Sequence, residues 1–180
     1  IPNWDNFGGL GAMNDGIKGA VGLGNGGQGA GIWPIHLASY SHFMKAEAAM
    51  WLGDAATAAT LMEAGMNLSF QKVLGFGSLD PNADSNYFAT ATEVSDFVAL
   101  KMAEFNAAPL TSALDGLGWP VEKDKLDILG EQYFVAMFGG ANDAWNFMRR
   151  TGYPRTLSRG IMDNVESGPF PRTGTYPTGE

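Results

Sequence analysis

The residues whose types suit ligand binding gather near the start of the chain, in a glycine-rich stretch. Trp4 lies between Asn3 and Asp5, and Asn14 and Asp15 follow a few residues later. An aromatic ring can cover the apolar face of a pyranose, while short amides and carboxylates bind its hydroxyl groups. These residues predict a sugar-binding loop. The competing interpretation is a tightly turned surface segment that binds no ligand.

Trp119 is the remaining candidate ligand-binding residue, and it stands in the sequence Gly118-Trp119-Pro120. Glycine and proline on either side of the ring indicate an irregular connection rather than a helix. The side chain then serves either as a packing plug or as an exposed platform for a ligand. The sequence leaves both interpretations open.

A nucleotide site is not expected, although Gly22–Gly27 matches the string GxGxxG. A dinucleotide-binding loop follows a strand and opens a helix, whereas more glycines and Pro34 follow this one. A phosphate-binding loop is excluded as well, because no Gly-Lys-Ser/Thr triplet comes after the glycines.

The spacing of the reactive residues does not support catalysis. Glycoside hydrolysis needs two carboxylates on opposite sides of the scissile bond. The candidates are Asp15, Asp84, Glu93 and Asp143, and no pattern pairs them. The chain also has no cysteine and no GxSxG nucleophile motif. We therefore expect no catalytic residue, and a glycoside hydrolase is the least favoured alternative.

Metal binding is not expected either. His36 and His42 are six residues apart, so they do not share a helix face as an i, i+4 metal pair does. Neither histidine belongs to a Glu-x-x-His arrangement. Solvent-exposed or hydrogen-bonded structural roles suit both side chains, and we predict no cofactor.

The composition indicates an acidic protein with enough apolar residues to build a core. The 180 residues carry a formal net charge of −8, and 45% of them are hydrophobic. A negative net charge disfavours nucleic acid and anionic membrane surfaces as partners. No run of about 18 apolar residues is present, so we predict no transmembrane helix.

Two helices joined by a tight turn are predicted over about residues 34–52 and 55–72. Gly53 can end the first helix and Asp54 can cap the second. Apolar residues recur every three or four positions in the first helix, and its expected buried stripe comprises Tyr40, Phe43, Met44, Ala48 and Trp51. The pair has tetratricopeptide-like character. Since one such unit needs neighbours to bury its faces, we expect the chain to be part of a longer protein.

The second half of the chain predicts further helices. A loop over residues 74–91 leads to a helix of about residues 93–107, which Thr92 is expected to cap. A connector over residues 108–122 follows. Its glycine and proline content separates this helix from the next apolar stripe.

The last two predicted helices meet at Gly139-Gly140, because glycine accepts the left-handed conformation that ends many helices. The first of them carries an apolar stripe over residues 126–138. Either Asn142 or Asp143 is expected to cap the second. Gly152 is expected to end it.

Two adjacent arginines, Arg149 and Arg150, close the last predicted helix, where cations suit the negative end of the helix dipole. Trp145 and Tyr153 flank them. One guanidinium group is expected to stack on an aromatic ring or to fork onto a carboxylate. Glu47 is a candidate partner because it stands among alanines. We therefore assign structural roles to Trp145 and Tyr153 and to both arginines.

This region resembles the SusD/RagB family of surface lipoproteins of Bacteroidetes outer membranes. The matching motif is Ala144-Trp145-Asn146 followed by Arg149-Arg150-Thr151-Gly152-Tyr153-Pro154. Two further segments resemble the family, and they are Leu37-Ala38-Ser39-Tyr40 with Ala46-Glu47-Ala48-Ala49, and Gly168-Pro169-Phe170-Pro171-Arg172 with Tyr176-Pro177. The three segments follow the family's order and cover about residues 31–180.

The resemblance implies an all-α fold, mostly helical with long irregular loops. It would combine the tetratricopeptide-like hairpin with C-terminal SusD-like helices and an extended tail, anchored by Arg172 and Tyr176. Residues 34–180 would form the C-terminal part of one helical domain whose N-terminal part is not in this sequence. Residues 1–33 would precede it as a glycine-rich segment and potential ligand loop.

The resemblance also implies a function. Such a protein would bind a glycan at the outer surface of the outer membrane and deliver it to a SusC-like TonB-dependent transporter. An N-terminal lipid outside this sequence would attach it to the membrane. The alternatives are an oligopeptide ligand within the same family and a helical-repeat scaffold without a small ligand. The shared motifs carry no ligand residues, so the six candidate residues rest on residue type and loop context alone.

Overall fold

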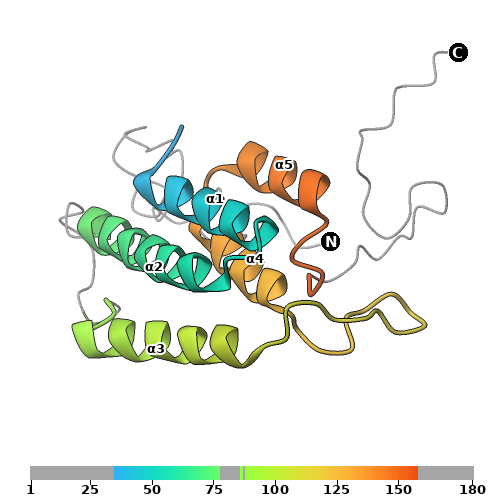
Figure 1. Cartoon of the computed structure of the whole chain (residues 1–180). Helices are drawn as coiled ribbons and strands as arrows, with labels where there is room; N and C mark the ends of the chain where they lie inside the picture. Colours follow the sequence, from blue (N-terminus) through green and yellow to red (C-terminus); the bar gives the residue numbers. More distant parts are fainter. Residues whose placement is uncertain (1–34, 78–85, 87, 158–180) are drawn as a thin grey trace, which may run out of the picture.

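The computed structural model describes residues 35–77, 86 and 88–157 as helices joined by loops (Figure 1). The helices are α1 (Ala38–Trp51), α2 (Ala55–Gly77), α3 (Ala91–Ala107), α4 (Lys125–Ala136) and α5 (Ala141–Thr151). Among the described residues there is no named strand, and the one isolated bridge joins Leu114 to Pro120. The prediction of an all-α fold is confirmed.

The hairpin of α1 and α2 forms as the sequence predicts. Gly53 adopts a φ of 81°, and Asp54 Oδ1 accepts the backbone N–H of Thr57 at 2.9 Å. A methyl group at Gly65 of α2 would lie 2.9 Å from the ring of Phe43 on α1. Because glycine has no such group, the two helices can approach closely at this point.

The boundaries of these two helices differ from the prediction. α1 begins at Ala38 rather than near residue 34, because Leu37 keeps extended backbone angles and supplies no side-chain cap. α2 continues to Gly77, so the first residues of the expected loop 74–91 are helical. Gly75 lies within α2, where glycine costs about 1 kcal/mol relative to alanine and does not have to end a helix.

α3 is capped by Thr90, and the predicted cap at Thr92 is wrong. The Thr90 hydroxyl accepts the backbone N–H of Glu93 at 3.2 Å, and the Glu93 carboxylate accepts the backbone N–H of Thr90 at 2.8 Å. This reciprocal arrangement satisfies two donors at the helix end, whereas Thr92 already lies inside the first turn.

α5 also begins earlier than predicted. Gly140 is its N-cap and makes no side-chain cap hydrogen bond, so neither Asn142 nor Asp143 takes that position. Asp143 instead places a carboxylate in the first turn of the helix, where the helix dipole favours negative charge. The predicted end is confirmed, because Gly152 adopts the left-handed conformation with a φ of 77°.

α4 is the central helix of the described fold and contacts α1, α2 and α3. Tyr133 of α4 stacks on Phe43 of α1 with ring centroids 5.2 Å apart, and it meets Phe147 of α5 edge-on at 4.9 Å. Such aromatic pairs stabilise a core beyond the apolar area that they bury. Burial raises the pKa of Tyr133 to about 12. One cluster of buried rings thus joins three helices.

The buried face of α1 differs in part from the predicted stripe. Its apolar residues in the core are Tyr40, Phe43, Ala46 and Ala49. Met44 is half-exposed, and Ala48 and Trp51 are exposed as well. The helix therefore turns its alanine-rich side inward and leaves Trp51 at the surface.

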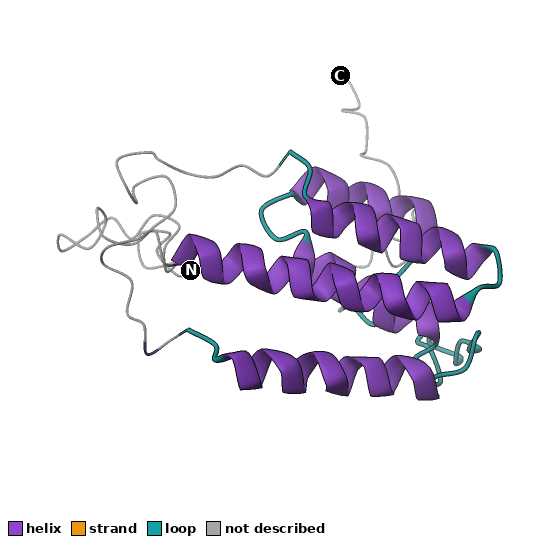
Figure 2. Cartoon of the chain, turned by 60° about the vertical axis from the view of Figure 1, so that its left-hand side comes forward, coloured by secondary structure: helices purple, strands orange, loops and turns teal. Residues whose placement is uncertain are grey.

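α3 lies along the outer side of α2, as Figure 2 shows, and its C-terminal end is tied to the start of α4. The Lys125 ammonium group donates to the carbonyl oxygen of Phe105 and, at 3.1 Å, to that of Asn106. Cations near a helix C-terminus pair with carbonyl groups that have no partner within the helix. Burial lowers the pKa of Lys125.

Candidate functional site

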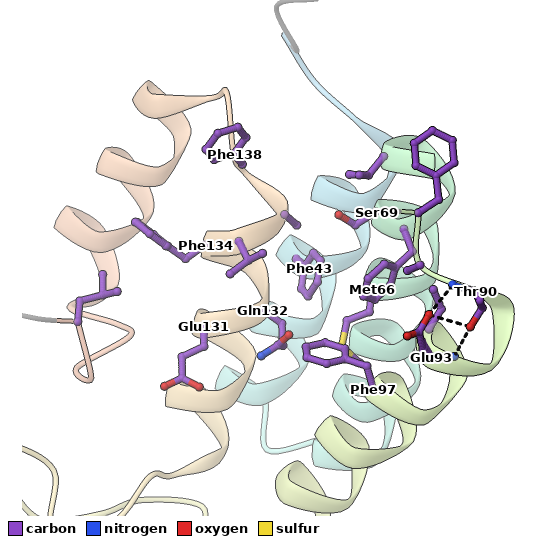
Figure 3. Close-up of a pocket in the computed structure, with 18 of the residues that line it drawn as sticks. Phe43, Met66, Ser69, Thr90, Glu93, Phe97, Glu131, Gln132, Phe134 and Phe138 are labelled. Carbon is purple, nitrogen blue, oxygen red and sulfur yellow. Dashed lines mark hydrogen bonds between the residues drawn. The ribbon is translucent and has the colours of Figure 1, made fainter. Parts of the chain in front are cut away.

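A pocket of about 1110 Å³ opens between α2, α3 and α4 (Figure 3). Phe43 and Met66 lie at its base, Phe97 extends from α3, Phe134 extends from α4, and Phe138 lies in the turn after α4. Pockets of this size that are lined by aromatic and aliphatic side chains typically accept apolar groups of a ligand. This pocket is therefore a candidate binding site.

The carboxylates at the edge of the pocket already have partners. Glu93 is held in the N-terminal cap of α3 by Thr90, as the dashed lines in Figure 3 show. Glu131 accepts the hydroxyl of Thr156 at 2.5 Å and forms an ion pair with Lys123 at 2.9 Å. The pocket therefore offers mainly apolar surface to a ligand.

A second feature is an ion pair that joins α5 to α1. Arg150 forks onto Glu47, with Nη1 donating to Oε1 and Nη2 donating to Oε2 at 2.8 Å. Trp51 Nε1 donates to the same Oε1 at 3.2 Å. The Glu47 side chain is only 5% exposed, whereas that of Arg150 is 57% exposed. The hydrogen bond with Glu47 raises the pKa of Arg150. We call these three residues the Glu47 clasp.

A third feature is a buried ion-pair cluster at the start of α4. Arg155 Nη2 donates to Asp124 Oδ2 at 2.7 Å and to Asp127 Oδ2 at 2.5 Å, and Nη1 donates to the carbonyl oxygen of Ser112 at 3.0 Å. Tyr153 donates its hydroxyl to Asp124 Oδ2 at 3.3 Å. The hydrogen bond with Asp127 raises the pKa of Arg155. We call this group the Arg155 cluster.

The two aspartates of this cluster also form the N-terminal cap of α4. Asp124 accepts the backbone N–H of Asp127 at 3.0 Å, and Asp127 accepts that of Asp124 at 3.3 Å. Close contact reinforces the arrangement, because a methyl group at Gly130 would lie 3.2 Å from the backbone nitrogen of Pro154. The Arg155 cluster thus holds the segment after α5 against α4.

A family model described as Susd and RagB outer membrane lipoprotein matches residues 33–173, which include all five helices of the described part. The chain belongs to the SusD/RagB family. Membership implies an outer membrane lipoprotein that binds nutrients at the cell surface. No curated protein and no solved structure matches the chain significantly. None of the described helices is both long enough and apolar enough to cross a bilayer.

The structure gives the family's RRTGYP motif a physical role in this chain. Arg150 makes the fork onto a carboxylate that was expected of one of the two arginines. Tyr153 and Pro154 hold the following segment on α4. Arg149 is exposed and forms no ion pair within the described residues, and Trp145 is 40% exposed. The structural roles assigned to Arg149 and Trp145 remain predictions.

Five of the six predicted ligand residues lie outside the described part of the chain, and they are Asn3, Trp4, Asp5, Asn14 and Asp15. The two predicted tail anchors of this SusD/RagB chain, Arg172 and Tyr176, lie outside it too. All of them remain predictions.

Trp119 lies half-buried in the loop between α3 and α4. Asp115 Oδ1 accepts the backbone N–H groups of Leu117 and Trp119 at 2.9 Å and 2.8 Å, and Gly118 adopts a φ of 79°. The turn thereby fixes the backbone at Trp119. The next residue, Pro120, forms the isolated bridge with Leu114. A ligand role for the ring remains a prediction.

Both histidines of the described region make local contacts. His36 Nε2 lies 2.8 Å from Ser41 Oγ, and His42 Nδ1 donates to the carbonyl oxygen of Ala38 at 2.9 Å. In the part of the chain that the structure describes, no three His, Asp or Glu side chains gather in a way that could hold a metal ion.

Sequence reasoning did not identify the Arg155 cluster or the pocket. The spacing Asp124-x-x-Asp127 before an apolar stripe is a capping-box pattern, and it was the available signal for the cluster. The pocket gave no such signal, because phenylalanines at helical spacing indicate a core equally well.

Proposed function

We propose that this chain is the ligand-capturing part of a SusD/RagB surface protein, which binds a glycan and passes it to a SusC-like TonB-dependent transporter. The observation that carries the proposal is the family match over residues 33–173. Capture requires binding and release rather than bond cleavage, so it needs neither a catalytic residue nor a cofactor. Opening and closing over the transporter would couple capture to import.

The aromatic content of the chain supports a glycan as the ligand. Trp51 is 61% exposed at the end of α1, where its aromatic ring can cover the face of a sugar. The net charge of −8 favours a neutral ligand over an acidic one. The loop candidates named above would add further rings and polar groups.

An oligopeptide is the second candidate ligand, and the pocket between α2, α3 and α4 favours it. Apolar peptide side chains would gain free energy on leaving water for the space between Phe97, Phe134 and Phe138. Sugar hydroxyl groups would find few free partners there, since Glu93 and Glu131 are already hydrogen-bonded.

Calorimetric titration of the full chain against oligosaccharides and oligopeptides, with product analysis of the same mixtures, tests the proposal. Saturable binding of an intact oligosaccharide is the expected result. If only peptides bind, the ligand is an oligopeptide and not a glycan. Cleavage products would indicate a hydrolase, and the absence of binding across both panels would favour a scaffold.

A pair of matched variants separates the two ligand classes. Phe138 is 88% exposed at the edge of the pocket, and Leu117 is 73% exposed in a distant loop. Phe138→Ser should weaken peptide binding if the pocket holds peptide side chains, whereas Leu117→Ser should not. Equal effects of the two substitutions would contradict a peptide site in the pocket.

We also propose a location at the outer surface of the outer membrane, where an N-terminal lipid would hold the protein. Fatty-acid labelling and proteolysis of intact cells test both parts. An unlabelled protein would contradict the lipid, and one that protease cleaves only after lysis would contradict the outer surface. Copurification of a TonB-dependent transporter from solubilised membranes is the expected result for the partner.

A further inference from the structure

Trp51 is held at one edge and open to solvent over most of its surface. It ends α1, and 61% of its surface is exposed. Its indole N–H is fixed on Oε1 of Glu47, which is itself buried and held by Arg150. A side chain that is already ordered loses less conformational freedom when a ligand binds. The ring is therefore better prepared for binding than a freely rotating surface tryptophan.

Arg150 places hydrogen-bond donors next to this ring. A guanidinium group has five N–H donors, and Glu47 receives one from each of Nη1 and Nη2. The remaining donors include Nε–H, and the side chain is largely exposed. The indole N–H and Nη1 reach the same oxygen of Glu47, so ring and guanidinium are neighbours. In Figure 1 the C-terminal ends of α1 and α5 lie side by side accordingly.

Asn146 extends the polar part of this surface. It is exposed on α5, four residues before Arg150 and therefore on the same helix face. Its amide can donate and accept hydrogen bonds. The Arg150 guanidinium carbon also lies 6.0 Å from the centre of the buried Phe147 ring. This contact and the fork onto Glu47 both restrict the arginine.

The combination of groups fits a sugar ring better than other ligands. A pyranose has an apolar face for the indole, and neighbouring hydroxyl groups that accept from a guanidinium and exchange hydrogen bonds with an amide. An apolar peptide side chain would leave those donors without partners. An acidic sugar is disfavoured, because Glu47 neutralises Arg150 and the chain carries a net charge of −8.

We propose that Trp51, Arg150 and Asn146 form a binding surface for a pyranose unit of a neutral oligosaccharide. This surface lies on the helical body, not in the predicted glycine-rich loop. The inference rests on the proposed function, since it names a place and a ligand class for the captured nutrient.

Substitutions at Trp51 separate the ring from its hydrogen bond. Trp51→Gln removes the ring, keeps an N–H donor for Glu47 and is well tolerated in a helix. Trp51→Phe keeps an aromatic face and removes the donor. Trp145→Gln is the matched control, because this second exposed tryptophan lies about 140° around α5 from Arg150 at 3.6 residues per turn.

Titrations of the full chain with maltohexaose, cellohexaose, mannohexaose and xylohexaose test the proposal. For a sugar that binds, Trp51→Gln should weaken the affinity about tenfold and Trp51→Phe about threefold, because the aromatic face provides most of the contact. Trp145→Gln should leave the affinity unchanged. Should Trp51→Gln fail to fold, Asn146→Ala replaces it and should weaken binding as well.

The outcomes distinguish this inference from the proposed function. Unchanged affinity after Trp51→Gln, or after Asn146→Ala where that replaces it, overturns the inference and leaves glycan capture intact. The absence of binding of all four sugars to the unaltered chain overturns both. Tighter binding of trigalacturonic acid than of any neutral sugar overturns the neutral ligand class.

Discussion

Two arginines of the same short segment, Arg150 and Arg155, bind carboxylates in opposite surroundings. The Arg155 side chain is 16% exposed and contacts aspartates that are 1% and 0% exposed. The Arg150 side chain is 57% exposed, although its partner Glu47 is buried. In the Arg155 cluster the donors reach two carboxylates and a backbone carbonyl, whereas the Glu47 clasp leaves several arginine donors toward solvent.

The same kind of ion pair, an arginine with a carboxylate, therefore has different roles in buried and in half-exposed surroundings. A buried charge without its partner is costly, so the Arg155 cluster is required by the fold around it. A half-exposed arginine contributes less to stability, because water can replace part of its hydrogen bonding. The Glu47 clasp is therefore the arginine site that remains available to a ligand.

The largest effect should come from Arg155→Ala. It leaves Asp124 and Asp127 buried without their cation, so the free energy of unfolding should fall by about 3–5 kcal/mol. Urea denaturation followed by circular dichroism measures this. Arg149→Ala is the control, since Arg149 is exposed and should contribute no more than about 0.5 kcal/mol. Equal losses in the two variants would contradict the role of the cluster.

Arg150→Ala should have a smaller effect of about 1–3 kcal/mol, the range for hydrogen bonds to a charged group. The loss arises because the Glu47 carboxylate stays buried. Adding Glu47→Gln removes that charge and keeps an acceptor for Trp51, so the double variant should be more stable than Arg150→Ala alone. A double variant that is less stable than Arg150→Ala alone would refute this explanation. Thermal unfolding of both variants measures the difference.

Lysine substitutions sharpen the comparison further. A lysine keeps the charge but loses the planar fork, and Arg155 uses more of that fork than Arg150 does. Arg155→Lys should therefore cost about 1 kcal/mol more than Arg150→Lys in unfolding free energy. Urea denaturation of both variants measures the two losses of unfolding free energy. Equal losses would mean that the number of hydrogen bonds made by each arginine does not determine its contribution to stability.

The smallest effect is expected at Trp145, which belongs to neither group of ion pairs. Because its side chain is 40% exposed and only partly packed, Trp145→Ala should lower the free energy of unfolding by about 1 kcal/mol. A loss of several kcal/mol in differential scanning calorimetry would instead show that this exposed ring supports the fold.

Local signals predicted the helices well, because each depends on few neighbouring residues. Gly53 with Asp54 marked the first turn, and Gly152 marked the end of α5. The cap of α3 was misplaced by two positions because Thr90 and Thr92 are alike in sequence. Only the reciprocal contact with Glu93 distinguishes them.

Contacts between distant residues were harder to predict. The pairing of Glu47 with an arginine was anticipated from its alanine neighbours, and Arg150 makes it. Nothing local indicated that Arg155 would reach the cap of α4. Trp51 was expected in the buried stripe, and its exposure depends on how α1 rotates against α4. Periodicity gives a face but not the rotation that packing selects.

The sequence separation of these contacts bears on the order in which the chain folds. Arg155 contacts residues 28 to 43 positions earlier, whereas Arg150 and Glu47 are 103 positions apart. Loop-closure entropy rises with the logarithm of this separation, which makes the longer closure about 1 kcal/mol more costly. Residues 112–155 should then assemble first and the Glu47 clasp last. Accordingly, Arg155→Ala should slow refolding, whereas Arg150→Ala should mainly accelerate unfolding.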